Sequence, residues 1–125
     1  REWVVRAGQT GKLPFTPQGV GSHWSRRVQV DVVAVNRQEH SLLLGECKWT
    51  AGRMSRNDVR ELIERKTPKV LQDLADAETE GWTVHYAFFA RAGFTDAARS
   101  YAMDHDALLV TLDELESGLR SREGK

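Results

Sequence analysis

The sequence predicts a mixed α/β domain, in which an antiparallel hairpin and a parallel strand–helix–strand unit share one sheet with helices on its faces. Two aliphatic runs, residues 28–35 and 41–49, flank a short polar connection, which is typical of a β-hairpin. Strand patterns at 82–90 and 107–111 enclose a helical pattern, which indicates a parallel βαβ unit. The strands are almost continuously apolar, so both faces of the sheet are expected to be covered.

Length and composition agree with one domain. The chain has 125 residues, 40% of them hydrophobic, with four Trp and four Phe, which is enough for one core. The single Cys excludes an internal disulfide and a multi-cysteine zinc site, and no apolar run reaches the roughly 20 residues that span a bilayer. We therefore expect a cytoplasmic protein with no membrane partner. Because the sequence opens without Met, we also expect residues 1–125 to be a piece of a longer chain, truncated within its first helix.

The segment before the hairpin contains a helix and a connection. Residues 1–7 carry apolar side chains at helical spacing, which predicts the last turns of a helix ended by Gly8. Residues 8–25 mix Gly, Pro, Ser and Thr, which predicts an irregular connection. Three apolar residues are expected to anchor this connection to the core: Phe15, Val20 and Trp24.

A long helical segment follows the hairpin. Ser55 with Asp58 three residues later is typical of a capping box, which opens a helix. Pro68 is unfavourable inside a helix but suits the first turn of a new one, with Thr67 as its cap. Residues 55–80 are therefore predicted to form either one kinked helix or two consecutive helices.

Two further helices flank the last predicted strand. Thr95 is the expected N-cap of a helix that runs to about Asp104. Thr111 and Glu114 have the spacing of a capping box, which predicts a last helix ending near Gly118. The βαβ unit thus consists of the strand at 82–90, the helix after Thr95 and a short buried strand.

The hairpin brings two acidic residues together. We pair Asn36 with Ser41 across the connection, and the same register places Asp31 opposite Glu46, with Cβ atoms about 5 Å apart. Lys48 follows Glu46 by two residues and points to the same face. Two carboxylates in apolar surroundings repel each other unless a proton or a cation lies between them, and oxygen ligands at a partly open site suit Mg²⁺ or Mn²⁺. We therefore expect a metal site, with Lys48 orienting a water molecule or neutralising negative charge.

The residues of this site resemble a known superfamily. Asp31, followed by Glu46-Cys47-Lys48 at the end of the next strand, resembles the D…(D/E)-x-K signature of the PD-(D/E)XK, or restriction-endonuclease-like, superfamily. The resemblance implies a metal-dependent nuclease fold over nearly the whole chain, with Asp31 and Glu46 as catalytic metal ligands. It also implies the backbone carbonyl of Cys47 as a third ligand and Lys48 as the catalytic lysine. Many members place a Glu on the first helix, where Glu2 is the candidate.

A narrower resemblance concerns the stretches 30–34, 45–49 and 92–95, which resemble an uncharacterised domain often found C-terminal to archaeal-type ATPases. It implies a Mg²⁺-dependent or Mn²⁺-dependent deoxyribonuclease with DNA as its partner and an ATPase domain in the same chain. The alternative is an inactive DNA-binding or regulatory module of an ATPase with the same fold. Because cutting both strands of a duplex often needs two copies of a nuclease, a homodimer is a candidate assembly.

The distribution of charge leaves room for a nucleic-acid partner. The formal net charge is zero, but residues 1–69 carry 13 basic and 7 acidic side chains, whereas residues 70–125 carry 5 and 11. Phosphate contacts need basic side chains, and the basic part contains five candidates: Arg26, Arg27, Arg53, Arg56 and Arg60. A solvated surface is the alternative for such residues, and we expect it for Arg65 and Lys66.

Overall fold

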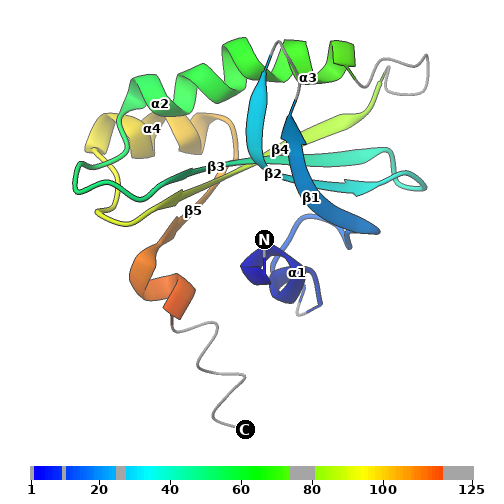
Figure 1. Ribbon diagram of the computed structural model, residues 1–125, viewed down its shortest axis with the longest axis horizontal. Coiled ribbons are helices and arrows are strands. Elements are labelled where there is room, and N and C mark those ends of the chain that lie inside the picture. Colours follow the sequence, from blue (N-terminus) through cyan, green and yellow to red (C-terminus); the bar gives the residue numbers. More distant parts are fainter. Residues whose placement is uncertain (1, 10, 25–27, 74–80, 117–125) are drawn as a thin grey trace, which may run out of the picture.

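A computed structural model describes residues 2–9, 11–24, 28–73 and 81–116, with the backbone alone for residues 2, 23 and 24. Within these residues, five strands form one sheet in the order β1-β2-β3-β4-β5 (Figure 1). The elements follow one another along the chain as α1 (Glu2–Gln9), β1 (Gly19–Trp24), β2 (Gln29–Asn36), β3 (Ser41–Lys48), α2 (Arg56–Arg60), η1 (Glu61–Lys66), α3 (Thr67–Asp73), β4 (Thr83–Ala90), α4 (Asp96–Asp104) and β5 (Leu108–Thr111).

The sheet is mixed, as predicted. β2 and β3 form the antiparallel hairpin in the predicted register, from Asn36 opposite Ser41 to Val32 opposite Gly45. β4 lies parallel to β3, and β5 lies parallel to β4 after the crossover through α4. The predicted α/β architecture, with a hairpin and a βαβ unit in one sheet, is therefore confirmed.

Helices cover both faces of the sheet. In Figure 1, α2, η1, α3 and α4 lie on one face and α1 lies on the other. The helix-side core consists of Val28, Val30, Leu42, Leu44, Met54, Val59, Leu62, Val70, Phe88, Ala90, Phe94, Ala98 and Ala102. The α1-side core consists of Val4, Ala7, Leu13, Phe15, Val32, Ala34, Leu43, Ala87, Phe89 and Val110. Successive β3 residues alternate between these cores, which explains their unbroken apolar run.

The prediction of an irregular connection over residues 8–25 is wrong in its second half. Gly19–Trp24 form β1, an edge strand antiparallel to β2. The two glycines of this segment give it a low local propensity for a strand. Pairing with β2, rather than local propensity, specifies β1. Of the expected anchors, Phe15 is buried and Val20 packs against the α1-side core, while the Trp24 side chain lies outside the described part.

The first helix continues past its predicted end. Gly8 lies inside α1, which runs to Gln9. A Cβ atom at Gly8 would lie 2.6 Å from Cδ of Pro17, so this glycine permits the close approach of the following loop rather than ending the helix. Val4 and Ala7 lie on the buried face of α1, as their spacing predicts.

Residues 56–73 form one uninterrupted helical run. Of the two predicted forms, the single helix is therefore correct over these residues, and two separate helices are not. Thr67 is helical and caps no second helix. Its N–H donates to the carbonyl of Leu62, five residues earlier, and its hydroxyl donates to the same oxygen at 2.8 Å. This wide π turn directly precedes Pro68, which has no N–H to donate, and π turns and prolines are both places where helices depart from regular geometry. Residues 74–80 lie outside the described part.

Three of the predicted helix caps are present, at Ser55, Thr95 and Thr111. The Ser55 side chain accepts the N–H of Asp58 in a complete capping box, and the Thr95 hydroxyl accepts the N–H of Ala98 at 3.1 Å. Residues 112–116 are helical after Thr111, whose hydroxyl accepts the N–H of Glu114, while residues 117–125 lie outside the described part. None of the described helices has the length and apolar character needed to cross a membrane.

Candidate metal and catalytic site

Asp31 lies at a bulge in β2. The β1–β2 ladder shifts register between Gly21 and His23, so two residues of β2, Asp31 and Val32, lie opposite a single residue of β1. A bulge bends a strand and redirects a side chain. Accordingly, Val30 belongs to the helix-side core and Val32 to the α1-side core, and β2 changes direction along its length in Figure 1.

The Asp31 carboxylate extends from this bulge to β3. Its Oδ2 accepts the N–H of Cys47 at 2.9 Å, which brings it to the residue next to Glu46. Burial, followed by the effect of the neighbouring Asp31 carboxyl group, raises the pKa of Glu46 to about 7, although the nearby Lys66 ammonium acts in the opposite direction. The structure thus brings the two acidic residues together, and close to neutral pH Glu46 is partly protonated, so a cation could replace its proton.

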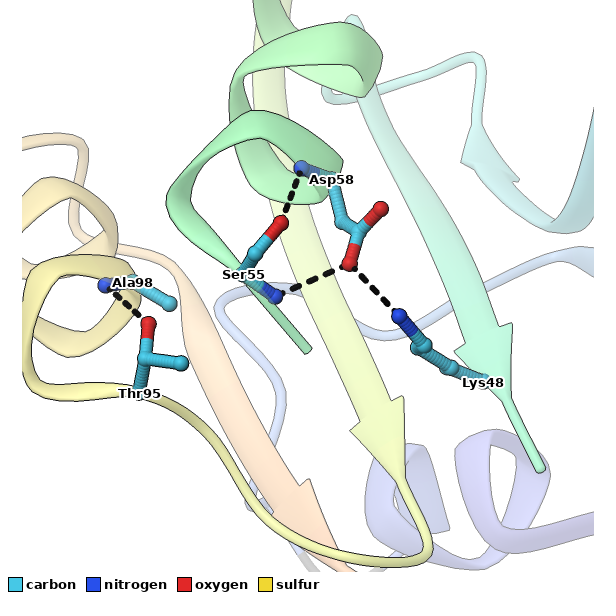
Figure 2. Close-up of polar contacts among 5 residues, drawn as sticks. All are labelled: Lys48, Ser55, Asp58, Thr95 and Ala98. Atoms are coloured by element: carbon cyan, nitrogen blue, oxygen red, sulfur yellow. Dashed lines mark hydrogen bonds and ion pairs between the residues drawn. The ribbon is translucent and has the colours of Figure 1, made fainter. Parts of the chain in front are cut away.

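Lys48 ends β3 and lines the same pocket as Glu46, which has a volume of about 200 Å³. The Lys48 Nζ lies 3.1 Å from Oδ2 of Asp58, the same oxygen that accepts the N–H of Ser55 at 2.9 Å (Figure 2). Burial acts to raise the pKa of Asp58, but the hydrogen bonds from Ser55 and Lys48 outweigh it and hold the pKa below its ordinary value. The cap of α2 therefore also fixes the position of Lys48.

Lys66 also belongs to the site. The expectation of a solvated surface for this residue is wrong. Its ammonium forms an ion pair with the Glu46 carboxylate and donates to the carbonyl of Gln29 at 3.1 Å. The side chain of Lys66 is 29% exposed, whereas that of its neighbour Arg65 is 75% exposed. The available signal was the position of Lys66 four residues after the buried Leu62, on the helix face that covers the sheet.

The candidate phosphate-binding arginines lie on the exposed surface. Arg53, Arg56 and Arg60 are all exposed. Arg60 pairs with Glu64 at 2.7 Å, and the guanidinium of Arg56 lies 5.4 Å from the centre of the Tyr101 ring. Arg56 and Arg60 thus have partners within the helical layer, and neither lines the pocket that contains Glu46.

The candidate metal ligands are few. Among the described residues, no three side chains of His, Cys, Asp and Glu are grouped so that they could hold a metal ion. The candidate donor set is therefore limited to two side chains, Asp31 and Glu46, with the Cys47 carbonyl as the third candidate. In a strand, the N–H and C=O of one residue point to the same neighbouring strand, so this carbonyl is directed to the side of Asp31, as the N–H is. Arg26, Arg27 and the side chain of Glu2 lie outside the described part.

This donor set fits a magnesium ion. Mg²⁺ keeps several water ligands and is commonly held by one or two carboxylates, and the pKa of Glu46 is raised beside Asp31, so a positive charge is needed there when Glu46 ionises. The Cys47 side chain is not a competing nucleophile, because it packs against the α1-side core and burial raises its pKa to about 11.

Comparison with protein families gives an assignment. Residues 1–63 match the model of DUF234, described as archaea bacterial proteins of unknown function. The chain belongs to this family. A relative of this DUF234 domain, the uncharacterized protein MJECL04 of Methanocaldococcus jannaschii, is 27% identical over 74 residues, or 59% of the chain. The matched segment spans only 15% of that relative's length.

Two solved structures share the fold of this DUF234 domain. The crystal structure of AF1548, described as a protein of unknown function, aligns with 97% of the chain and 64% of its own length, with a TM-score of 0.56 and 18% identity. A repair endonuclease from Pyrococcus abyssi aligns with 76% of the chain and 39% of its own length, with a TM-score of 0.51 and 16% identity. The predicted restriction-endonuclease-like fold is therefore confirmed.

Proposed function

We propose that this DUF234 domain is a metal-dependent nuclease that hydrolyses phosphodiester bonds in DNA. The observation that carries the proposal is the pair of Asp31 and Glu46 carboxyl groups beside Lys48, at the end of β3. The fold supports it, since a repair endonuclease has a similar one. Asp31 and Glu46 are the proposed metal ligands, with the Cys47 carbonyl as the third, and Mg²⁺ or Mn²⁺ is the proposed ion.

The side chains have separate roles in this proposal. When bound, the metal ion would stabilise negative charge on a phosphate and lower the pKa of a water molecule. Asp31 and Glu46 supply the negative charge that binds a cation. Lys48, held at the pocket by Asp58, supplies an ammonium group that can orient the attacking water or neutralise the charge that develops on the phosphate. The exposed Arg53 follows Lys48 in the chain and is the proposed phosphate contact nearest to it in sequence.

The wider context is also proposed. We expect DNA as the partner, an ATPase domain in the same chain, a cytoplasmic location and a homodimer where both strands of a duplex are cut. The greater length of the MJECL04 relative, of which this chain matches 15%, leaves room for such a second domain. The DNA-binding surface is expected in the basic part, residues 1–69.

A second candidate function is a DNA-binding or regulatory module without catalysis. It is favoured by the ion pairs at the pocket: Glu46 is paired with Lys66 and Lys48 with Asp58, so Glu46 and Lys48 already have charged partners without a metal ion. The small number of side-chain ligands among the described residues points the same way. Only a measurement of cleavage separates the two functions.

The test is incubation of the chain with supercoiled plasmid DNA in Mg²⁺ or Mn²⁺. We expect nicked and linear products, and a loss of at least about 100-fold in rate for Glu46→Gln or Lys48→Met, because each removes charge from the proposed site. Glu39→Gln is the matched control, since Glu39 is an exposed carboxylate at the turn at the other end of the hairpin.

Each result has a defined meaning. Cleavage that survives in both site variants contradicts the assignment of Glu46 and Lys48. Absence of cleavage together with salt-sensitive DNA binding by the wild type supports the module instead. Loss of activity in Glu39→Gln would show that the assay responds to charge in general rather than to this site.

A further inference from the structure

The carboxyl pair of the proposed site already has a cation in the fold. The Lys66 ammonium forms an ion pair with Glu46 and also donates to the backbone carbonyl of Gln29. The side chains of Lys66 and Glu46 are 29% and 16% exposed, so water screens this pair less than it screens a surface salt bridge. Lys66 therefore joins η1, β2 and β3 at the position of the carboxylates.

The second lysine of the pocket does not take this role. Lys48 pairs with Asp58, which is held by the capping box of α2 at the N-terminal end of the same helical run. Lys66 lies eight residues after Asp58 in that run, at the end of the π segment. The two lysines thus neutralise different carboxylates, and the described lysine that contacts the Asp31–Glu46 pair is Lys66.

The helical geometry directs Lys66 into the pocket. Leu62 is fully buried in the helix-side core and also lines the pocket, together with Lys66. The Leu62 carbonyl accepts both the N–H and the hydroxyl of Thr67, so the π turn is closed immediately after Lys66. The backbone that carries the ammonium is therefore fixed, and only the flexible end of the side chain can move away from Glu46.

We propose that Lys66 is a built-in counter-cation of the carboxyl pair, and that a divalent ion binds by displacing its ammonium from Glu46. This inference rests on the metal site of the proposed function. Two cations cannot occupy the same position at one carboxylate, so the ion pair opposes metal binding, and by linkage metal binding opposes the ion pair. Lys66 is thus a positioning residue that holds Glu46 before the metal ion arrives and sets the affinity of the site.

The test compares Mn²⁺ binding by the wild type and by Lys66→Met, measured by isothermal titration calorimetry without DNA. Methionine keeps most of the apolar side chain and removes the charge, so we expect it to bind Mn²⁺ about tenfold more tightly. We also expect its melting temperature in EDTA to be lower, and its increase on adding Mn²⁺ to be larger, than in the wild type. Lys69→Met is the control, because Lys69 is exposed on α3, one turn away.

The outcomes separate this inference from the proposed function. Equal affinities in wild type and Lys66→Met, or weaker binding in the variant, overturn the displacement while leaving the metal site in place. If the wild type binds Mn²⁺ no better than Glu46→Gln does, the metal site and the displacement both fail. Should Lys66→Met not fold, Lys66→Gln replaces it with the same expected direction, because it also removes the competing charge.

Discussion

Two acidic residues at the pocket are each paired with a lysine, but their electrostatic settings differ. Asp58 is stabilised as an anion, because backbone and ammonium groups donate to it and its pKa falls below the ordinary value despite burial. Glu46 is more deeply buried and shares its position with Asp31, so its pKa rises to about 7. Of these two residues, Glu46 is therefore the one that is partly protonated near neutral pH, and it is the one proposed to bind a cation.

Glu46 makes the stability of the metal-free chain depend on pH. Its pKa rises from 4.5 to about 7 on folding. The neutral carboxyl group therefore contributes to the free energy of unfolding, fully below pH 4.5, and this contribution is lost as the pH rises through 7. In Glu46→Gln the group cannot ionise. We expect the free energy of unfolding of the wild type to fall, relative to this variant, by about 1–3 kcal/mol between pH 5 and pH 8.

Urea denaturation in EDTA at several pH values measures this difference. The lowered pKa of Asp58 does not interfere, because its stabilisation is present above the ordinary pKa of 3.8 and is lost only as the pH falls through the lower pKa of the folded chain. Parallel pH profiles of wild type and Glu46→Gln would show that folding does not perturb Glu46.

The sequence was sufficient to place three of the site residues and not the fourth. Asp31, Glu46 and Lys48 follow from a short hairpin connection and the period of two along a strand, which are local rules. The bulge at Asp31 and the contact of Lys66 depend on how β1 and the long helix pack against the hairpin. Such packing combines distant segments, so the position of Lys66 four residues after Leu62 indicates its side of the helix but not its contact with Glu46.

At the scale of elements, β3 is the strand on which the site depends. It pairs with β2 on one side and β4 on the other, and it alternates between the two cores. Gly45 precedes Glu46 in this strand, where an added Cβ would lie 3.1 Å from Cβ of Val32 and 3.2 Å from the carbonyl oxygen of Ala87. The absence of a side chain therefore lets neighbouring strands approach at the residue before the proposed ligand.

We expect Gly45→Ala to destabilise the fold by about 1–3 kcal/mol, because part of the crowding is against backbone that cannot move aside. Gly21→Ala is the matched control, since an added Cβ in the edge strand β1 would meet nothing within 4 Å. It should leave stability unchanged or raise it slightly. Thermal unfolding of both variants measures the contrast, and equal effects would contradict the close packing at Gly45.

The difference between the apolar strands and the glycine-containing edge strand β1 explains which elements could be predicted from the sequence. β2, β3, β4 and β5 carry aliphatic or aromatic residues that are typical of buried strands, and the caps at Ser55 and Thr95 mark two helix starts. β1 has two glycines and lies at the edge, where one neighbour supplies all its pairing. Its existence is a property of the sheet and not of its own six residues.

For the whole molecule, the zero net charge conceals two unlike parts. The basic part, residues 1–69, contains every proposed ligand and every candidate phosphate contact, whereas residues 70–125 are acidic. An arrangement of this kind favours contact with a polyanion through one region and disfavours it elsewhere. The proposed DNA complex should therefore be weak and strongly dependent on salt.

Fluorescence anisotropy with a labelled duplex, between 50 and 200 mM salt, tests this expectation. We expect the binding constant to fall as salt rises, and Arg53→Gln to reduce the slope of log K against log salt by about one, as the loss of one phosphate contact would. Arg37→Gln, at the hairpin turn, should keep the wild-type slope. Identical slopes for wild type and Arg53→Gln would remove Arg53 from the proposed interface.

The loop between β3 and α2 is attached at both ends. The carbonyl of Lys48 accepts the N–H of Arg91. At the other end, the buried Met54 donates its N–H to the carbonyl of Gly93 and accepts the N–H of Thr95 at its own carbonyl. Residues 49–53 between these attachments are all exposed. Because lengthening such a loop costs little free energy, insertions here should leave Lys48 and the cap at Ser55 in place. In related chains this is where differences in length can accumulate beside the site, and in protein engineering it is a suitable position for grafting a recognition segment.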